Sequence, residues 1–181
     1  MLMSATDSQA QFEQVVVPHL DAAYNLARWL AGNDHDAEDI AQEASLRAFR
    51  FLGGFRGGNS RSWLLTIVRN TAYTWLKQNR PQTLVSVSDE EWLDLEDPTA
   101  LASHSSALHH ADRDVLRAAL EDLPVEFREV LLLRELEGLS YKEIADVADA
   151  PIGTVMSRLA RGRRLLVTHL TQLRDGGSHG M

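Results

Sequence analysis

The stretch that decides the fold runs from residue 138 to residue 164 and reads GLSYKEIADVADAPIGTVMSRLARGRR. Ser140 stands three residues before Glu143, which is the spacing of a helix capping box. Pro151 ends the helix that follows, because proline lacks a backbone N–H and clashes with the preceding turn. A second helix is predicted to begin near Gly153. The stretch therefore predicts two short helices joined by a tight turn.

The second of these helices is predicted to be apolar on one face and basic on the other. The apolar face repeats at helical spacing and comprises Val155, Leu159, Gly162 and Leu166. The opposite face comprises Ser157, Arg158, Arg161 and Arg164. A helix pair with a basic outer face is typical of modules that enter the DNA major groove. An ordinary helical hairpin with a solvated basic face is the alternative.

Composition limits the class of protein. A chain of 181 residues can form one medium domain or two small ones. It contains no cysteine, which excludes disulfides and thiolate-ligated zinc and is compatible with a reducing cytoplasm. No apolar run approaches the ~20 residues of a membrane span, and no signal-peptide pattern is evident. We therefore expect a cytoplasmic protein without membrane insertion.

The net charge of −8 is concentrated in one segment of the chain. Residues 81–112 contain seven acids and neither Lys nor Arg, whereas the flanking segments are almost neutral. Prolines, scattered Ser and Thr and weak periodicity predict an acidic flexible linker over residues 81–111. The flanks show helical periodicity and no sustained strand alternation. The sequence thus predicts an all-α chain of two small helical domains, 10–80 and 112–173, with a disordered tail at 174–181.

Apolar periodicity and turn residues predict where the individual helices lie. In the first domain we expect helices over residues 12–30, 36–51 and 60–78, the last of them capped by Ser60 or Ser62. In the second domain we expect helices over residues 115–123 and 126–136, followed by the helix-turn-helix.

Three stretches, in this order, resemble bacterial RNA polymerase sigma factors of the extracytoplasmic-function class. They read AEDIAQEASLRAFR (37–50), FRGGNSRSWLLTIVRNTAYTWLKQ (55–78) and LPVEFREVLLLRELEGLSYKEIADVADAPIGTVMSRLARGRRLL (123–166). The resemblance covers about residues 12–80 and 112–170. It implies a sigma region 2 domain, a sigma region 4 domain, and a function in promoter-specific transcription initiation with core RNA polymerase and promoter DNA as partners. Family members are often restrained by an anti-sigma factor, and the sequence leaves such a partner open.

The resemblance also implies roles for particular side chains. By resemblance, the residues expected to dock on the largest polymerase subunit are Asp39, Gln42, Glu43 and Arg47. For the −10 element, Asn70 is expected to contact a base that has left the stack. The expected phosphate contacts are Arg56, Arg61, Arg69, Lys77 and Arg80. The residues expected to contact the −35 element are Met156, Ser157, Arg158, Ala160, Arg161 and Arg164. A solvated helix face with an internal Glu43–Arg47 pair is the alternative for the first set.

Two other functions remain as alternatives at the level of sequence. A helix-turn-helix regulator that binds duplex operators would explain residues 138–164 but not the other two stretches. A metal-dependent enzyme is suggested by His104, His109 and His110, but these lie in the predicted linker and lack metal-ligand spacing. We therefore expect no enzymatic activity, no cofactor and no metal site.

Overall fold

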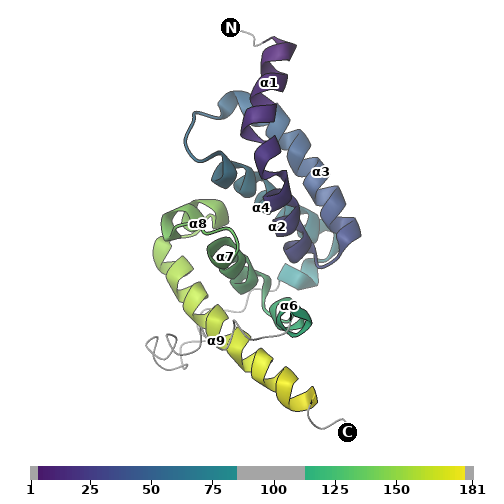
Figure 1. Cartoon of the computed structure of the whole chain (residues 1–181), viewed down its shortest axis with the longest axis vertical. Coiled ribbons are helices and arrows are strands. Elements are labelled where there is room, and N and C mark those ends of the chain that lie inside the picture. The colour runs from purple at the N-terminus through teal and green to yellow at the C-terminus, as the bar shows by residue number, and fades with distance from the viewer. Residues whose placement is uncertain (1–3, 85–112, 178–181) are drawn as a thin grey trace.

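The computed structural model describes residues 4–84 and 113–177, and within them every regular element is a helix (Figure 1). The prediction of an all-α chain with two helical domains is confirmed. Residues 81–84 of the predicted linker form a short 3-10 turn, η3 (Pro81–Leu84), and residues 85–112 lie outside the described part. The histidines at 104, 109 and 110 fall in that undescribed segment.

The first domain packs three main helices around a core of small and aliphatic side chains. Its elements are α1 (Ala5–Val15), η1 (Val17–His19), α2 (Leu20–Ala31), α3 (Asp34–Phe51), η2 (Leu52–Gly54) and α4 (Ser60–Asn79). Helices α2, α3 and α4 contact one another pairwise. Buried alanines such as Ala27, Ala44, Ala48 and Ala72 let their axes approach closely.

Two predictions about the first domain are wrong in detail. The single helix expected over residues 12–30 is divided, because Pro18 lies in the first turn of η1, where its missing N–H ends the α1 hydrogen-bond ladder. Helix α4 is capped by Asn59 rather than by a serine, since the Asn59 side chain accepts a hydrogen bond from the Ser62 amide at 3.0 Å. Asparagine is as good an N-cap as serine, so sequence preference alone did not separate them.

The second domain contains the predicted helix-turn-helix. Its elements are α6 (Arg113–Glu121), α7 (Val125–Glu135), α8 (Tyr141–Ala148) and α9 (Ile152–Gly177). The capping box at Ser140 and Glu143 is present, and Asp149 ends α8 in the left-handed conformation with φ 50°. The predicted apolar face of α9 is buried. Helix α9 continues to Gly177, so residues 174–177 are helical instead of a tail, and 178–181 lie outside the described residues.

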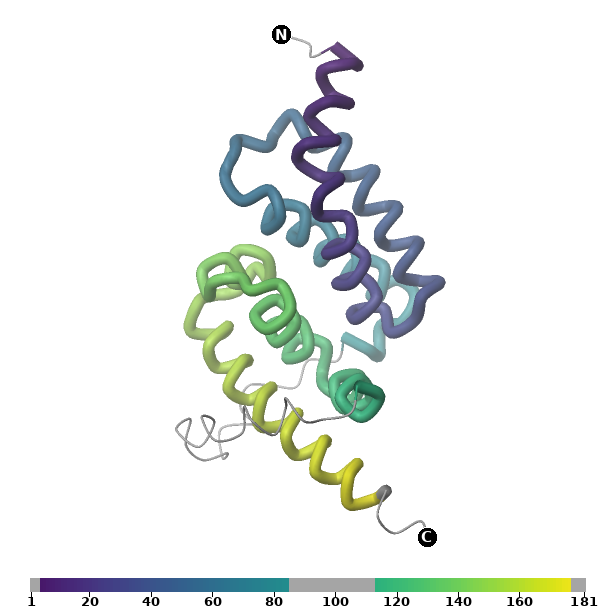
Figure 2. Tube along the Cα trace, viewed as in Figure 1, coloured from purple at the N-terminus to yellow at the C-terminus, as the bar shows by residue number. Residues whose placement is uncertain are grey.

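Helix α7 is buried over most of its surface. Val125, Phe127, Val130 and Leu133 are each at most 4% exposed. The helix contacts α8 and α9 of its own domain and α2 of the first domain. The tube view shows it between the first domain and α9 (Figure 2). Eight of its eleven residues are buried, and two of these, Arg128 and Glu129, are charged. The two domains therefore lie against each other where α7 meets α2 and where α8 meets α4.

Close packing between α7 and α9 depends on Gly162. A Cβ atom at this position would lie 3.2 Å from Leu131 Cδ1 and 3.3 Å from Phe127 Cβ. Gly153, at the start of the same helix, has no such neighbour within 4 Å.

We expect Gly162→Leu to lower the free energy of unfolding by about 1–3 kcal/mol, because the added side chain overpacks the α7–α9 contact. Gly153→Ala is the matched control and should leave stability unchanged or slightly raised. Urea unfolding followed by circular dichroism measures both. A Gly162→Leu protein as stable as the wild type would show that α9 can move away from α7 without cost.

Candidate nucleic-acid interface

The outer face of the helix-turn-helix is formed by the first turns of α9. Val155 and Leu159 point into the core, at 0% and 2% exposure, whereas Met156 is 52% exposed. Ile152 is also exposed, at 46%. Met156 and Ile152 therefore lie on the exposed face of α9, and the role of Met156 in DNA recognition stays a prediction.

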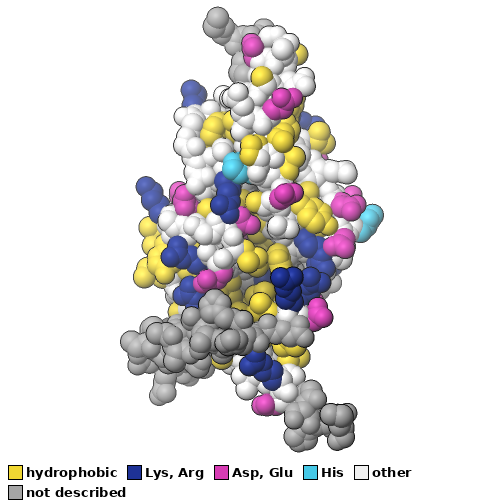
Figure 3. Space-filling model, in the orientation of Figure 1, with side chains coloured by type: hydrophobic (Ala, Val, Ile, Leu, Met, Phe, Trp, Pro, Cys, Tyr) yellow, Lys and Arg dark blue, Asp and Glu magenta, His cyan; other side chains and the backbone are white. Residues whose placement is uncertain are grey.

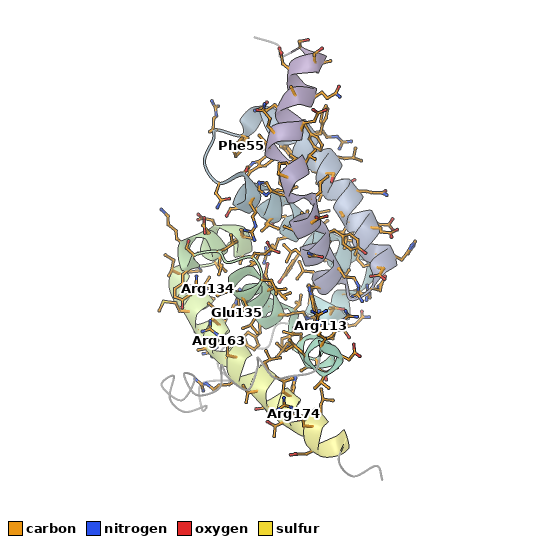
Figure 4. All side chains as sticks on the ribbon, in the orientation of Figure 1. Phe55, Arg113, Arg134, Glu135, Arg163 and Arg174 are labelled. Carbon is orange, nitrogen blue, oxygen red and sulfur yellow. The ribbon has the colours of Figure 1, made fainter. Side chains whose placement is uncertain are left out.

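The other predicted −35 residues are half-buried rather than fully exposed. These are Ser157, Arg158, Ala160, Arg161 and Arg164. The Arg158 guanidinium lies 3.8 Å from the Glu126 carboxylate, and the Ser157 hydroxyl donates to the Thr154 carbonyl at 3.1 Å. Arg163, labelled with Glu135 in Figure 4, donates to that carboxylate at 2.8 Å. Two arginines of α9, Arg158 on the predicted basic face and Arg163 outside it, are thus paired with acids of α7.

The −10 candidates divide between two neighbouring faces of α4. Asn70 and Lys77 are exposed, and because they are seven residues apart they lie almost in line along the helix. Arg56 is exposed on the loop before α4. Arg61 and Arg69 instead face the second domain. Arg80 is also engaged, donating to Asp36 at 2.5 Å and to the Ala31 carbonyl at 2.7 Å within the first domain.

Arg69 belongs to a buried polar cluster between the domains. Its Nε donates to Glu129 Oε1 at 2.7 Å, and the Tyr73 hydroxyl donates to Glu129 Oε2 at 2.8 Å. The guanidinium also lies over the Tyr73 ring, 3.9 Å from its centroid. Glu129, in the middle of α7, is 0% exposed. Both oxygens of this carboxylate are therefore satisfied by residues of the first domain.

Burial and charge shift the pKa values of all three groups in this cluster. Burial raises the pKa of Glu129, and the charge of Arg69 opposes that shift. Burial alone would lower the pKa of Arg69, but the Glu129 charge and hydrogen bond outweigh it and raise the value. Burial, followed by the Glu129 charge, raises the pKa of Tyr73, so its hydroxyl remains a neutral donor.

Three more polar contacts join the domains outside the buried cluster. The Arg61 guanidinium binds Glu137, with Nε 3.0 Å from Oε2. Asn59 Nδ2 donates to Glu143 Oε1 at 2.6 Å. In the third contact the donor belongs to the second domain: the buried Arg128 of α7 donates to the Trp29 carbonyl of the first domain at 2.7 Å. Sequence analysis missed all of these pairs, which join residues 60 or more positions apart.

The predicted polymerase-docking residues line one side of α3. Asp39 and Gln42 are exposed, whereas Glu43 and Arg47 are half-buried and form an ion pair at 2.9 Å. Next to them an apolar groove opens between α1, α2 and α3, and hydrophobic side chains reach the surface there (Figure 3). Its lining includes Phe12, Leu20, Tyr24, Gln42, Leu46 and Phe49. This face therefore combines polar groups with an accessible apolar surface.

Potential metal ligands gather at the start of α3. Among the described residues, His35, Asp36 and Asp39 bring ligand atoms within 4.8 Å of one another. Asp36 already accepts hydrogen bonds from Arg80 and from Asn33, each at 2.5 Å. The Asp36 carboxylate of this cluster thus already stabilises the turn between α2 and α3 through its hydrogen bonds. Within the described ranges, every helix is too short or too polar to cross a bilayer.

The chain matches two protein families along its length. Residues 15–82 match Sigma-70 region 2, and residues 113–166 match Sigma-70, region 4. It is similar to the ECF RNA polymerase sigma factor SigE of Mycolicibacterium smegmatis, with 35% identity over 175 residues, covering 94% of this chain and 67% of that protein. It is also similar to the ECF RNA polymerase sigma-E factor of Escherichia coli, with 38% identity over 137 residues, covering 72% of each.

A solved structure resembles both domains together. It is the sigma factor RpoE of Bartonella quintana in complex with the anti-sigma factor NepR, with a TM-score of 0.68 and 28% identity. The similarity covers 88% of this chain and 96% of that one.

Proposed function

This chain belongs to the sigma-70 family as a sigma factor of the extracytoplasmic-function class, and from this premise we propose which of its surfaces carry out promoter recognition. As a sigma factor it binds core RNA polymerase and directs promoter-specific transcription initiation. The presence of both family regions in order on one chain carries this conclusion. A helix-turn-helix regulator would need only the second region and is not favoured.

In our proposal the first domain, residues 10–80, binds core polymerase and the −10 element. Asn70 reads a base that leaves the stack, because a carboxamide can donate and accept hydrogen bonds at a base edge. Its exposure on α4, in line with the exposed cation Lys77, supports this assignment. Arg61 and Arg69 complete the phosphate-binding surface once they are released from the second domain.

The second domain, residues 112–173, is proposed to bind the −35 element through α9. Its outward side chain at the centre of the first turns is Met156. A thioether cannot make the bidentate contact to guanine that arginine makes, but it can contact a thymine methyl group. Ser157, Arg158, Arg161 and Arg164 are proposed to contact the backbone on either side, and Ala160 lets the helix approach the bases.

The docking surface for polymerase is proposed to be the α3 face with Asp39, Gln42, Glu43 and Arg47. The apolar groove beside it, with Leu46 and Phe49, supports this assignment, because protein interfaces combine an apolar centre with a polar rim. A helical segment of the polymerase would lay apolar side chains in the groove and pair its polar groups with the rim.

Three further assignments complete the proposal. The protein acts without catalysis of its own, since its family acts through binding. It works in the cytoplasm, where core polymerase and chromosomal DNA are found. An anti-sigma factor is a further partner, supported by the similarity to a sigma factor solved in complex with one.

Purified protein and core RNA polymerase together should initiate transcription from specific fragments of the source genome, and neither should do so alone. A run-off assay with a genomic fragment library detects the transcripts and maps their start sites. Folded protein and active core enzyme that yield no specific transcript would refute the sigma function.

Asn70→Ala should weaken open-complex formation by about 1–3 kcal/mol, because one good base contact is lost, while binding to core polymerase stays unchanged. Asn79→Ala is the matched control, an exposed asparagine on the opposite side of α4. Permanganate footprinting of a promoter mapped by run-off measures the melted region. Equal footprints for the two variants would remove Asn70 from base recognition.

A further inference from the structure

The exposed tip of the helix-turn-helix is apolar rather than basic. Between residues 151 and 164 the exposed positions are Pro151, Ile152, Gly153 and Met156, and none of them carries a charge. Ile152 is 46% exposed and Met156 is 52% exposed. They are four residues apart on α9, so their side chains are neighbours on one face of that helix. We call these two side chains the apolar pair.

The apolar pair lies at the end of the helix where base contacts are made in helix-turn-helix proteins. Ile152 is the first residue of α9, and the Val155 amide closes the first turn by donating to the Pro151 carbonyl at 3.1 Å. In such proteins the N-terminal residues of the second helix contact base edges in the major groove. A Cβ atom added at Gly153, between the two side chains, would have no neighbour within 4 Å. The first turn is therefore open to a close approach by DNA.

Cations lie beside the apolar pair, and the exposed turn of α9 carries no acid. Residues 151–174 contain neither Asp nor Glu. Arg158, Arg161 and Arg164 follow the pair along the helix, each half-buried. DNA has the matching arrangement, because phosphates border the major groove and thymine presents an apolar C5 methyl group on its floor. This complementarity favours duplex DNA as the occupant of the surface.

We propose that Ile152 and Met156 together read two thymine methyl groups of the −35 element, which makes Ile152 a second specificity-determining residue of this surface. The inference rests on the proposed function, because it places α9 in the major groove at that element. Four residues of helix span about 6 Å. Successive base pairs are about 3.4 Å apart. The two thymines therefore lie one or two base pairs apart, on the same strand or on opposite strands.

Removal of single methyl groups from the DNA tests this assignment. Deoxyuridine pairs as thymidine does and lacks only the C5 methyl group, so it replaces each thymine of the −35 element in turn, in a promoter mapped by run-off. The probe is a labelled duplex that carries this element and ends upstream of the −10 element. Fluorescence anisotropy measures its affinity for holoenzyme formed with the wild-type protein, Ile152→Ala, Met156→Ala or the control Leu173→Ala. Leu173 is an exposed aliphatic residue near the other end of α9.

With the wild-type protein and with Leu173→Ala, uracil should weaken binding about fourfold at each of two thymines, because one methyl group is no longer buried against the protein. Ile152→Ala should abolish this effect at one of the two thymines, and Met156→Ala should abolish it at the other. Both variants should bind core polymerase as tightly as the wild type, since neither side chain belongs to the proposed docking surface.

A −35 element that contains no thymine, or that binds equally well with uracil at every thymine, would overturn the proposal. Uracil effects that all persist in Ile152→Ala would assign the methyl groups to other residues and overturn the role of Ile152. Loss of core-polymerase binding by Ile152→Ala would place the apolar pair in a protein interface instead. These failures are distinct from failure of the sigma function, because run-off transcription with the wild-type protein tests that function before any base or residue is changed.

Discussion

The closed arrangement of this sigma factor depends on a carboxylate that has no access to water. Glu129 lies in the middle of α7 with 0% exposure, and a buried charge is tolerated only where its oxygens are paired and hydrogen-bonded. Arg69 and Tyr73 supply those partners from the other domain. Removal of one partner from such a pair costs about 3–5 kcal/mol, so the cluster holds the two domains in one register.

This constraint links stability to function. When the domains separate, water hydrates both Arg69 and Glu129. This hydration offsets much of the free energy lost when their ion pair breaks. Arg61 then becomes available as well, at the edge of the same surface. Asn70 and Lys77, on the neighbouring face of α4, are exposed while the cluster is formed. The proposed −10 surface therefore has one part that is accessible in the closed arrangement and one part that depends on domain separation.

Local structure was predictable from sequence and the contact between the domains was not. The Ser140–Glu143 capping box and the buried face through Val155 and Leu159 are properties of neighbouring residues, and both predictions are confirmed. Pro18 divided a helix whose apolar periodicity continued on both sides of it. The Arg69–Glu129 pair joins residues 60 positions apart, and local patterns carry no information about which distant cation a carboxylate will meet. A local signal did exist, because Glu129 directly precedes the apolar run of residues 130–133 and a buried acid there requires a partner. The predicted roles in DNA and polymerase binding stay predictions.

The distance between the two domains in the free protein tests the central claim most directly. The chain has no cysteine, so one cysteine introduced at the exposed Glu38 and one at the exposed Arg174 can be spin-labelled selectively. Double electron–electron resonance should give one narrow distance distribution for the otherwise wild-type protein. The distribution should become longer and broader when Glu129→Gln and Glu137→Gln are added, or when core polymerase is bound. A broad distribution in the free protein, unchanged by those two substitutions, would contradict the account.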